Sequence, residues 1–178
     1  MLALEAFAKL RTQQANSFLI LIGPETQPDY AKKLRDFIAA DNLSDGVKIL
    51  PGMRNDNPEL IQAFHACDVF VLPSMHEPFG IVVLEAWSSC KPVIVSRVGG
   101  LQALVRDGDT GFFIDPNAGD AAADLAAKLN RFATESELKN IIAANGLREA
   151  KSKYDWTQIG QQLETLYQRA EENFAKRK

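Results

Sequence analysis

Residues 68–89 read DVFVLPSMHEPFGIVVLEAWSS, and this stretch decides the fold. Its apolar, β-branched start at 69–72 is typical of a buried strand, and the largely apolar run from Ile81 to Ser89 predicts a helix. The connecting loop contains Pro, His and Glu and ends in Gly80. In an open parallel sheet, ligands bind beyond the carboxyl ends of the strands, so we expect this loop to lie at a binding site.

The rest of the chain continues this alternation of strand and helix. Further strands are expected at residues 18–22, 47–50, 92–95 and 112–114, and further helices at residues 2–10, 30–40, 58–66, 118–131, 135–151 and 154–174. Most of the strand runs lack polar alternation, which is typical of parallel strands covered on both faces. The sequence therefore predicts an α/β fold with a doubly wound, mainly parallel, Rossmann-like sheet, in a single domain that spans residues 1–178.

The first and last predicted helices do not complete the pattern: the first has no strand before it, and the last carries an apolar stripe whose packing partner is open. The chain begins inside a helical pattern, residues 2–10, with no strand before it to lead into that helix. The last predicted helix carries six apolar side chains on one stripe: Trp156, Ile159, Leu163, Leu166, Tyr167 and Ala170. We expect this stripe either to pack on the same domain or to dock on a domain that is absent from the chain.

Composition and charge exclude several classes of protein. A formal net charge of −3 does not provide the basic surface that a nucleic-acid partner requires. The chain has no apolar run of roughly 18 residues and no signal-peptide pattern, which argues against a spanning helix and leaves peripheral membrane contact open. Cys67 and Cys90 lie in apolar stretches and are expected to be buried, reduced thiols, which favours a cytoplasmic protein. With two histidines and no paired cysteines, a metal site is not expected.

Glu85 is the only polar side chain between Ile81 and Trp87. A helix that is apolar on all sides is buried, and a buried carboxylate requires partners. Those partners are either structural, an ion pair or a bond to a neighbouring backbone, or the vicinal hydroxyls of a ligand, as on the ribose in dinucleotide sites. Gly80 allows close backbone approach at the start of the same helix, where unpaired N–H groups suit a phosphate. With Glu77 in the loop before it, the pattern suits a nucleoside diphosphate sugar.

These residues resemble the signature of a known family. Glu77-Pro-Phe-Gly-Ile-Val-Val-Leu-Glu85 is similar to the Glu-x7-Glu signature of glycosyltransferase family 4 (group 1), enzymes with the two-domain GT-B fold. The segments at 68–74, 91–95, 99–100 and 107–112 follow in the family's order and spacing. The resemblance implies a C-terminal, donor-binding domain, with the helix at 154–174 crossing back to an N-terminal acceptor-binding domain that this chain lacks.

The resemblance also implies roles for single residues. Glu77 is the catalytic candidate, in contact with hydroxyls of the donor sugar, and Glu85 would hold the ribose hydroxyls. The other expected donor contacts are the backbone of Phe79 and Gly80 at the sugar, the amides of Ile81 and Val82 at the diphosphate, Arg54 in the loop near the base, and His76 beside the sugar.

The implied activity is retaining transfer of a hexose-like sugar from a nucleoside diphosphate sugar to an acceptor hydroxyl, without a cofactor and with a UDP-sugar favoured. In the family, an Arg and a Lys before the first helix neutralise the leaving diphosphate. This chain starts after that point, so we expect it to be inactive alone. Two alternatives remain open: a non-catalytic nucleotide-sugar-binding subunit, and another GT-B enzyme such as a nucleotide-sugar epimerase.

Overall fold

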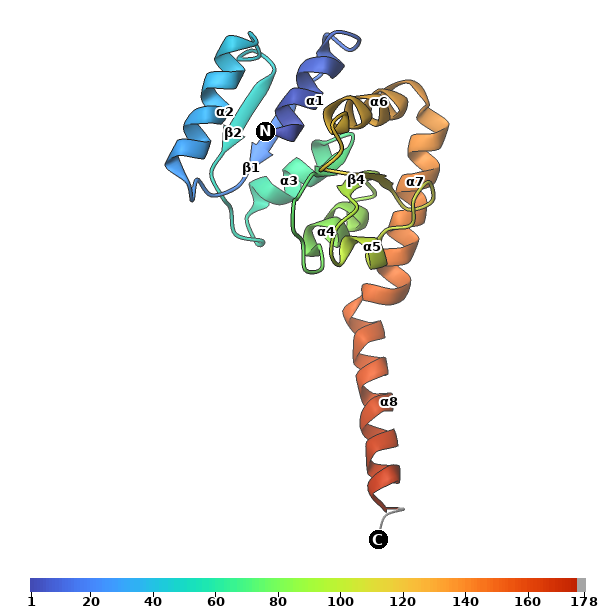
Figure 1. Ribbon diagram of the computed structural model, residues 1–178. Helices are drawn as coiled ribbons and strands as arrows, with labels where there is room; N and C mark the ends of the chain where they lie inside the picture. The colour runs from blue at the N-terminus through green and yellow to red at the C-terminus, as the bar shows by residue number, and fades with distance from the viewer. Residues whose placement is uncertain (176–178) are drawn as a thin grey trace.

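The computed structural model describes residues 1–175 and has the predicted α/β fold (Figure 1). Its strands are β1 (Leu19–Ile22), β2 (Val47–Leu50), β3 (Phe70–Leu72), β4 (Val93–Ser96) and β5 (Phe112–Ile114). Its helices are α1 (Leu2–Arg11), α2 (Pro28–Ala40), α3 (Pro58–Ala66), α4 (Ile81–Ser88), α5 (Leu101–Leu104), α6 (Ala121–Thr134), α7 (Ser136–Glu149) and α8 (Trp156–Ala175), with a π-helical turn, η1 (Ala150–Tyr154), between α7 and α8. The short helix α5 and the π-helical turn were not expected from the sequence.

All strand pairs in the described part of the chain are parallel, as predicted, but the sheet is in two parts. β1 pairs with β2, and β4 lies between β3 and β5. In the three-stranded part, Ile94 stands opposite both Val71 and Phe112. All four residues of β4 are buried, which identifies β4 as the centre of the fold.

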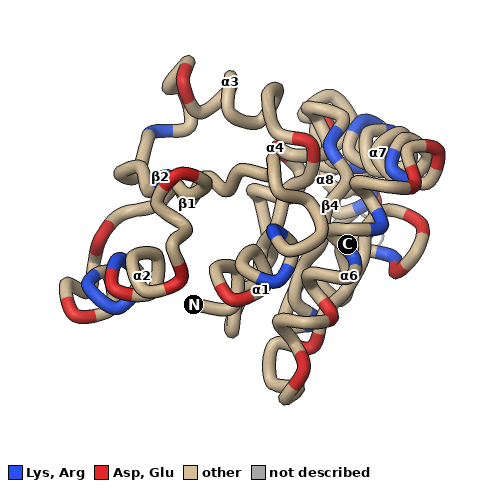
Figure 2. Tube along the Cα trace, turned by 90° about the horizontal axis from the view of Figure 1, so that it is seen from above, with Lys and Arg blue, Asp and Glu red and all other residues tan. Residues whose placement is uncertain are grey.

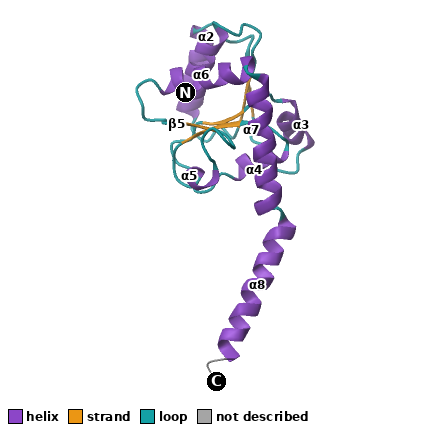
Figure 3. Ribbon diagram, turned by 90° about the vertical axis from the view of Figure 1, so that its right-hand side faces the viewer, coloured by secondary structure: helices purple, strands orange, loops and turns teal. Residues whose placement is uncertain are grey.

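Helices cover both faces of the three-stranded sheet, which is what the continuous apolar strand runs predict. Successive side chains of a strand point to opposite faces, so β4 contributes to two cores. Val93 and Val95 pack in a cluster with Trp87 of α4. Ile94 packs on the other side with Leu125 of α6 and with α1. Figure 3 shows the strands as a thin layer with α6 on one side and α4 and α5 on the other.

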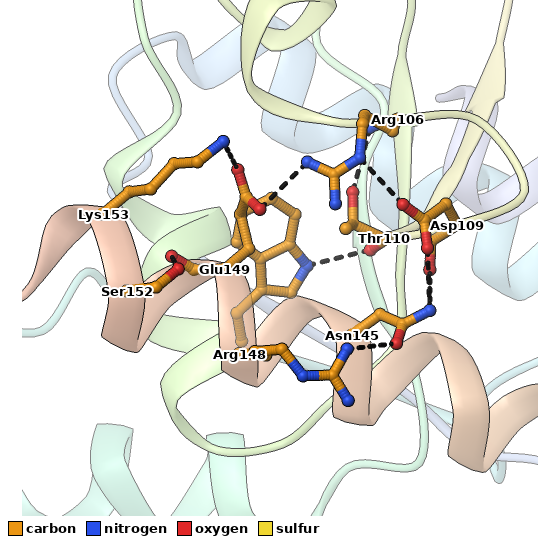
Figure 4. A network of polar contacts seen from close by, with 9 residues as sticks. Arg106, Asp109, Thr110, Asn145, Arg148, Glu149, Ser152 and Lys153 are labelled. Carbon is orange, nitrogen blue, oxygen red and sulfur yellow. Dashed lines mark hydrogen bonds and ion pairs between the residues drawn. The ribbon is translucent and has the colours of Figure 1, made fainter.

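A polar network fixes α4 against the helices that follow it (Figure 4). The Trp87 indole N–H donates a hydrogen bond to the Thr110 carbonyl at 3.0 Å. Glu149 is nearly buried and accepts from the Arg106 guanidinium at 2.9 Å and the Lys153 ammonium at 2.6 Å. Burial raises the pKa of the Glu149 carboxyl, but hydrogen bonds from Lys153 and Arg106 outweigh it and hold the pKa below its ordinary value. Glu149 therefore joins the end of α7 to η1 and to the loop before β5. The Trp87 hydrogen bond ties α4 to the same loop.

α8 leaves the domain instead of packing on it (Figure 1). None of its described residues is buried, and Trp156 is 85% exposed. The first of the two expected arrangements, packing of the apolar stripe on the same domain, is therefore not seen. No helix within residues 1–175 is long and apolar enough to cross a membrane.

The expectation that both cysteines are buried was wrong. Cys67 is half-buried and Cys90 is exposed. Cys90 follows α4 in the left-handed conformation, with φ of 56°, and ends the helix. A residue at that position turns away from the helix axis, so its apolar neighbours in the sequence do not bury it.

Candidate functional site

Gly80, the last residue of the loop before α4, fixes the conformation of the loop where it enters the helix. Gly80 has φ of +96°, a left-handed conformation that favours glycine, and it forms the N-cap of α4. A Cβ atom on Gly80 would also lie 2.6 Å from the Leu101 side chain. The next two residues, Ile81 and Val82, begin the helix, and no partner is found for their N–H groups among the described residues. Unpaired N–H donors therefore lie at the N-terminus of α4, which is the positive end of the helix dipole.

Gly99 and Gly100 support this loop from the next strand-to-helix connection. The Gly100 N–H donates a hydrogen bond to the Glu77 carbonyl at 2.9 Å. A Cβ atom on Gly99 would overlap that carbonyl, and a Cβ atom on Gly100 would overlap the Pro78 carbonyl. Only glycine lets the two connections approach this closely. Sequence reasoning read the double Gly as a family motif and did not connect it with Glu77.

Glu85 lies on α4, one turn after this helix start, with its side chain half-buried. No hydrogen bond or ion pair to its carboxylate occurs in the part of the chain that the structure describes, so the structural ion pair considered above is not found. Burial raises the pKa of the Glu85 carboxyl. Together with Val82, Pro73 and Met75, Glu85 lines one end of a large groove. A carboxylate without protein partners at a groove can accept hydrogen bonds from a ligand.

Glu77 is oriented by its own loop. Its carboxylate accepts a hydrogen bond from the Phe79 N–H at 3.3 Å, and its side chain is half-buried. Phe79 is 43% exposed and meets the Tyr154 ring edge-on, with 6.1 Å between the ring centroids. The loop is therefore in contact with the turn that leads into α8. His76 is exposed beside Glu77.

Arg54 is paired with a neighbouring side chain. Its guanidinium forms a bidentate ion pair with Asp56 at 3.0 and 3.1 Å, and both side chains are exposed. Of the other candidates, Val82 alone lines the groove that Glu85 lines. The structure thus brings together Glu77, Phe79 and Gly80 in one loop and Ile81, Val82 and Glu85 on the helix that follows, and it leaves Arg54 paired in another loop.

The arrangement offers one carboxylate in the loop, one on the helix, and free N–H groups between them. Carboxylates accept hydrogen bonds from hydroxyls, and a helix N-terminus binds anions. Neither Glu77 nor Glu85 has a cationic partner within residues 1–175. No group of three or more His, Cys, Asp or Glu residues able to hold a metal ion is found among the described residues. The site is therefore built for a ligand that has hydroxyls and an anionic group.

Comparisons with known proteins agree with this chemistry. The chain is 34% identical to a D-inositol 3-phosphate glycosyltransferase of Actinosynnema mirum, over 74% of the chain and 30% of that protein. It is 43% identical to the sulfoquinovosyl transferase SQD2 of Arabidopsis thaliana, over 55% of the chain and 19% of that protein. The chain thus spans less than a third of the length of these two curated relatives.

Solved structures show the same relationship. The Anabaena protein Alr3699/HepE in complex with UDP superposes with a TM-score of 0.80 at 32% identity, over 94% of this chain and 44% of that one. A C-terminal domain of a group 1 glycosyl transferase, LpcC from Francisella tularensis, superposes with a TM-score of 0.77 at 25% identity, over 87% of this chain and 78% of that one. The family model for the glycosyl transferases group 1 matches residues 1–149. The chain belongs to the group 1 glycosyl transferases, and its fold is one Rossmann-like half of the GT-B architecture.

Proposed function

We propose that this chain is the donor-binding domain of a retaining glycosyltransferase that moves a sugar from a nucleoside diphosphate sugar to an acceptor hydroxyl. One observation carries the proposal: the half-buried Glu85 carboxylate has no partner among the described residues, and it lies one turn beyond the free N–H groups that start α4. An unpartnered carboxylate is costly to bury, and vicinal hydroxyls of a ligand would satisfy it.

The proposed roles follow the order of groups along the donor. Glu85 accepts hydrogen bonds from the ribose hydroxyls. The amides of Ile81 and Val82 bind the diphosphate at the positive end of α4. Glu77 holds hydroxyls of the transferred sugar, with the Phe79 and Gly80 backbone and His76 around it. Arg54 contacts the base side of the nucleotide, for which it would have to exchange its ion pair with Asp56 for the ligand.

A UDP-sugar is the donor that we favour. The structurally similar Alr3699/HepE is known in complexes with UDP and with UDP-glucose, and the chain is 31–32% identical to it. The free thiols of Cys67 and Cys90 fit a reducing compartment such as the cytoplasm.

The acceptor site is proposed to lie on a second domain. α8 presents exposed apolar side chains, among them Trp156, Leu163 and Leu166, on a helix that leaves this domain. We infer that this stripe docks on the N-terminal, acceptor-binding domain. Closure of the two domains would exclude water from the donor and position the acceptor.

Titration of the isolated chain with nucleotides tests the donor site. Addition of UDP, GDP or ADP at millimolar concentration should shift the amide resonances of Gly80, Ile81 and Val82. Glu85→Gln should weaken nucleotide binding about tenfold or more, since a hydrogen bond to a charged group is worth ~1.5–3 kcal/mol. Glu164→Gln, on exposed α8, is the matched control and should bind as the unaltered chain does.

Two results would count against the proposal. One is the absence of any shift with all three nucleotides. The other concerns the two glutamates: Glu77→Gln should weaken a UDP-sugar and leave free UDP unaffected. Equal loss of free UDP binding in Glu77→Gln and Glu85→Gln would show that the assignment of sugar to one and ribose to the other is wrong.

A further inference from the structure

The π-helical turn η1 packs against the helix that carries Glu85. α7 runs beside α4 (Figure 1 and Figure 2), and η1 continues from the end of α7. Ala150, the first residue of η1, is buried in the same core cluster as Val83 and Trp87 of α4. A π-helical turn is a rare conformation that often marks a functional site. η1 therefore has a fixed place next to α4, although the helix that follows it leaves the domain.

Ion pairs hold η1 on the domain as well. Glu149, at the end of α7, is nearly buried and pairs with Lys153 at 2.6 Å and with Arg106 at 2.9 Å. Lys153 directly precedes Tyr154, the last residue of η1. The Tyr154 side chain is half-buried and packs against the core cluster of α4. The position of the Tyr154 ring is therefore set by the domain.

Beyond Tyr154 the chain turns away from the domain. Asp155 has an extended backbone, and its carboxylate accepts a hydrogen bond from the Thr157 N–H at 2.8 Å, which caps the first turn of α8. Trp156, which opens α8, is 85% exposed. Tyr154 thus stands at the point where the chain leaves the domain.

The Tyr154 ring meets the donor loop at Phe79. The two rings lie edge-on, with 6.1 Å between their centroids and 70° between their planes, an arrangement that aromatic pairs prefer. The Tyr154 hydroxyl has no hydrogen-bond partner among the described residues, so the ring itself makes the contact. The Phe79 backbone is confined by Gly100, since a Cβ atom there would lie 2.8 Å from the Phe79 Cα. Phe79 is therefore held by two segments that are distant from it in the sequence.

Phe79 in turn orients Glu77. Its N–H donates a hydrogen bond to the Glu77 carboxylate at 3.3 Å, and no other hydrogen bond to that carboxylate occurs within residues 1–175. This distance is long for an N–H donor, so a small shift of Phe79 would break the bond. The orientation of the Glu77 carboxylate thus depends on what holds the Phe79 ring.

We propose that Tyr154 is a positioning residue of the donor site, whose ring holds Phe79 and thereby keeps the Glu77 carboxylate in place for the transferred sugar. The inference rests on the proposed function, in which Glu77 binds hydroxyls of that sugar. Glu85 lies on α4 itself, which Trp87 anchors through its hydrogen bond to the Thr110 carbonyl at 3.0 Å. Loss of the Tyr154 ring therefore affects the sugar end of the donor and spares the nucleotide end.

Calorimetric titration of the chain with UDP and with UDP-glucose tests this separation. Tyr154→Leu should weaken UDP-glucose about two- to tenfold, the range that the loss of one edge-to-face aromatic pair corresponds to. The affinity for UDP should change less than about twofold. Equal weakening of the two ligands, or no change in either, would overturn the proposal.

Two further variants separate positioning from general loss of stability. Tyr154→Phe keeps the ring and should restore the ratio of the two affinities. Phe112→Leu removes one ring of another aromatic pair, which Phe112 forms with Phe132 at 5.2 Å on the opposite face of the sheet. It should lower the melting temperature and leave the ratio unaltered. A changed ratio in Phe112→Leu would show that loss of stability alone produces the effect, against the proposal.

A double-mutant cycle tests the contact itself. Phe79→Leu should cause the same selective loss as Tyr154→Leu, and the double variant should lose no more than either single variant, because both act through one contact. Additive losses would contradict the proposal.

An NMR measurement without ligand distinguishes this inference from the proposed function. The ¹H–¹⁵N heteronuclear NOE of Glu77 and Phe79 should fall in Tyr154→Leu and not in Tyr154→Phe, since the loop is freed only when the ring is lost. Unchanged NOE values would overturn the inference alone. Failure of the unaltered chain to bind UDP or UDP-glucose, with the NOE values falling as expected, would contradict the proposed function and leave the hold of Tyr154 on the loop supported.

Discussion

At the scale of single residues, the charged Glu85 carboxylate lowers the free energy of unfolding of the chain at neutral pH. Burial raises the pKa of its carboxyl in the folded chain above the ordinary value of 4.5. The folded state therefore binds more protons than the unfolded state at pH values just above 4.5, and the contribution of Glu85 to stability falls as the pH rises from there through the raised folded pKa. At neutral pH the charged, unpartnered carboxylate disfavours folding.

Glu85→Gln should accordingly stabilise the isolated chain at pH 7 while it weakens nucleotide binding. The gain should be small, below about 1 kcal/mol, because the side chain is only partly buried. Thermal unfolding at pH 4 and pH 7 measures it, and the difference between variant and unaltered chain should be larger at pH 7. Glu164→Gln should show no such pH dependence. Loss of stability at pH 7 in Glu85→Gln would mean that the carboxylate has a partner after all.

Gly100 is a second residue whose role can be tested singly. Its φ of −64° is one that alanine adopts freely, so Gly100→Ala introduces no backbone strain and acts only through its Cβ atom, which would lie 2.8 Å from the Phe79 Cα. The loop that carries Glu77 should shift, at a cost of about 1–3 kcal/mol for overpacking. Binding of UDP-sugar, measured by calorimetry, should fall by more than binding of UDP.

Gly119→Ala is the control for this change, since nothing lies within 4 Å of a Cβ atom there. It should leave both affinities and the melting temperature unaltered within error. If Gly100→Ala bound UDP-sugar as well as Gly119→Ala does, the glycine pair would not position the loop.

At the scale of elements, the Glu149 network joins α7 and η1 to the loop before β5 (Figure 4). The folded-state pKa of Glu149 is lowered, so its contribution to stability is present above the unfolded pKa, near 4.5, and is lost as the pH falls through the folded value. Glu149→Gln should therefore destabilise the chain at pH 7 by about 1–2 kcal/mol, a value reduced because Arg106 and Lys153 keep about half of their surface in water. Urea unfolding at pH 7 and pH 3.5 tests this, with a smaller difference expected at the lower pH.

Glu135→Gln provides the comparison with an exposed ion pair. Glu135 forms an exposed ion pair with Arg131 at 3.0 Å, so its loss should be much less destabilising than that of Glu149. Equal effects of the two substitutions would show that burial does not strengthen the Glu149 pairs. The comparison also matters for the site, since the same network holds the indole of α4.

At the scale of the whole molecule, the chain spans 44% of the length of Alr3699/HepE, with which it shares its fold. Charge that develops on a leaving diphosphate must be stabilised, and the loss of one donor of this kind usually costs about 10²–10³ in rate. Neither Glu77 nor Glu85 has a cationic partner among the described residues, and the acceptor site is proposed to lie on a second domain. We therefore predict no measurable transfer by this chain, in a donor-consumption assay with a panel of nucleotide-sugars.

The same assay on the chain joined to the proposed N-terminal, acceptor-binding domain should show transfer. Clear transfer by the 178-residue chain alone would contradict the prediction and require a complete active site within it. Nucleotide-sugar binding without transfer in the longer protein would favour a non-catalytic binding subunit.

Much of this protein follows from its sequence because the determining signals are local. The continuous apolar strand runs predicted a parallel sheet covered on both faces, and helix α3 was predicted with its bounds, since Asn57 caps it and Pro58 opens it. The spacing of Gly80 and Glu85 placed a carboxylate one turn after a helix N-terminus, because that distance is set by helix geometry alone.

Contacts between distant segments were decided only by the tertiary structure. The division of the sheet into two parts, the clamp of Gly99 and Gly100 on the Glu77 loop, and the exposure of Cys90 all depend on residues far apart in the sequence or on a backbone conformation that hydropathy does not encode. Whether Glu85 has a partner is a question of the same kind. A sequence shows that a buried carboxylate needs one, but only the packing of α4 among its neighbours shows that, within residues 1–175, it has none.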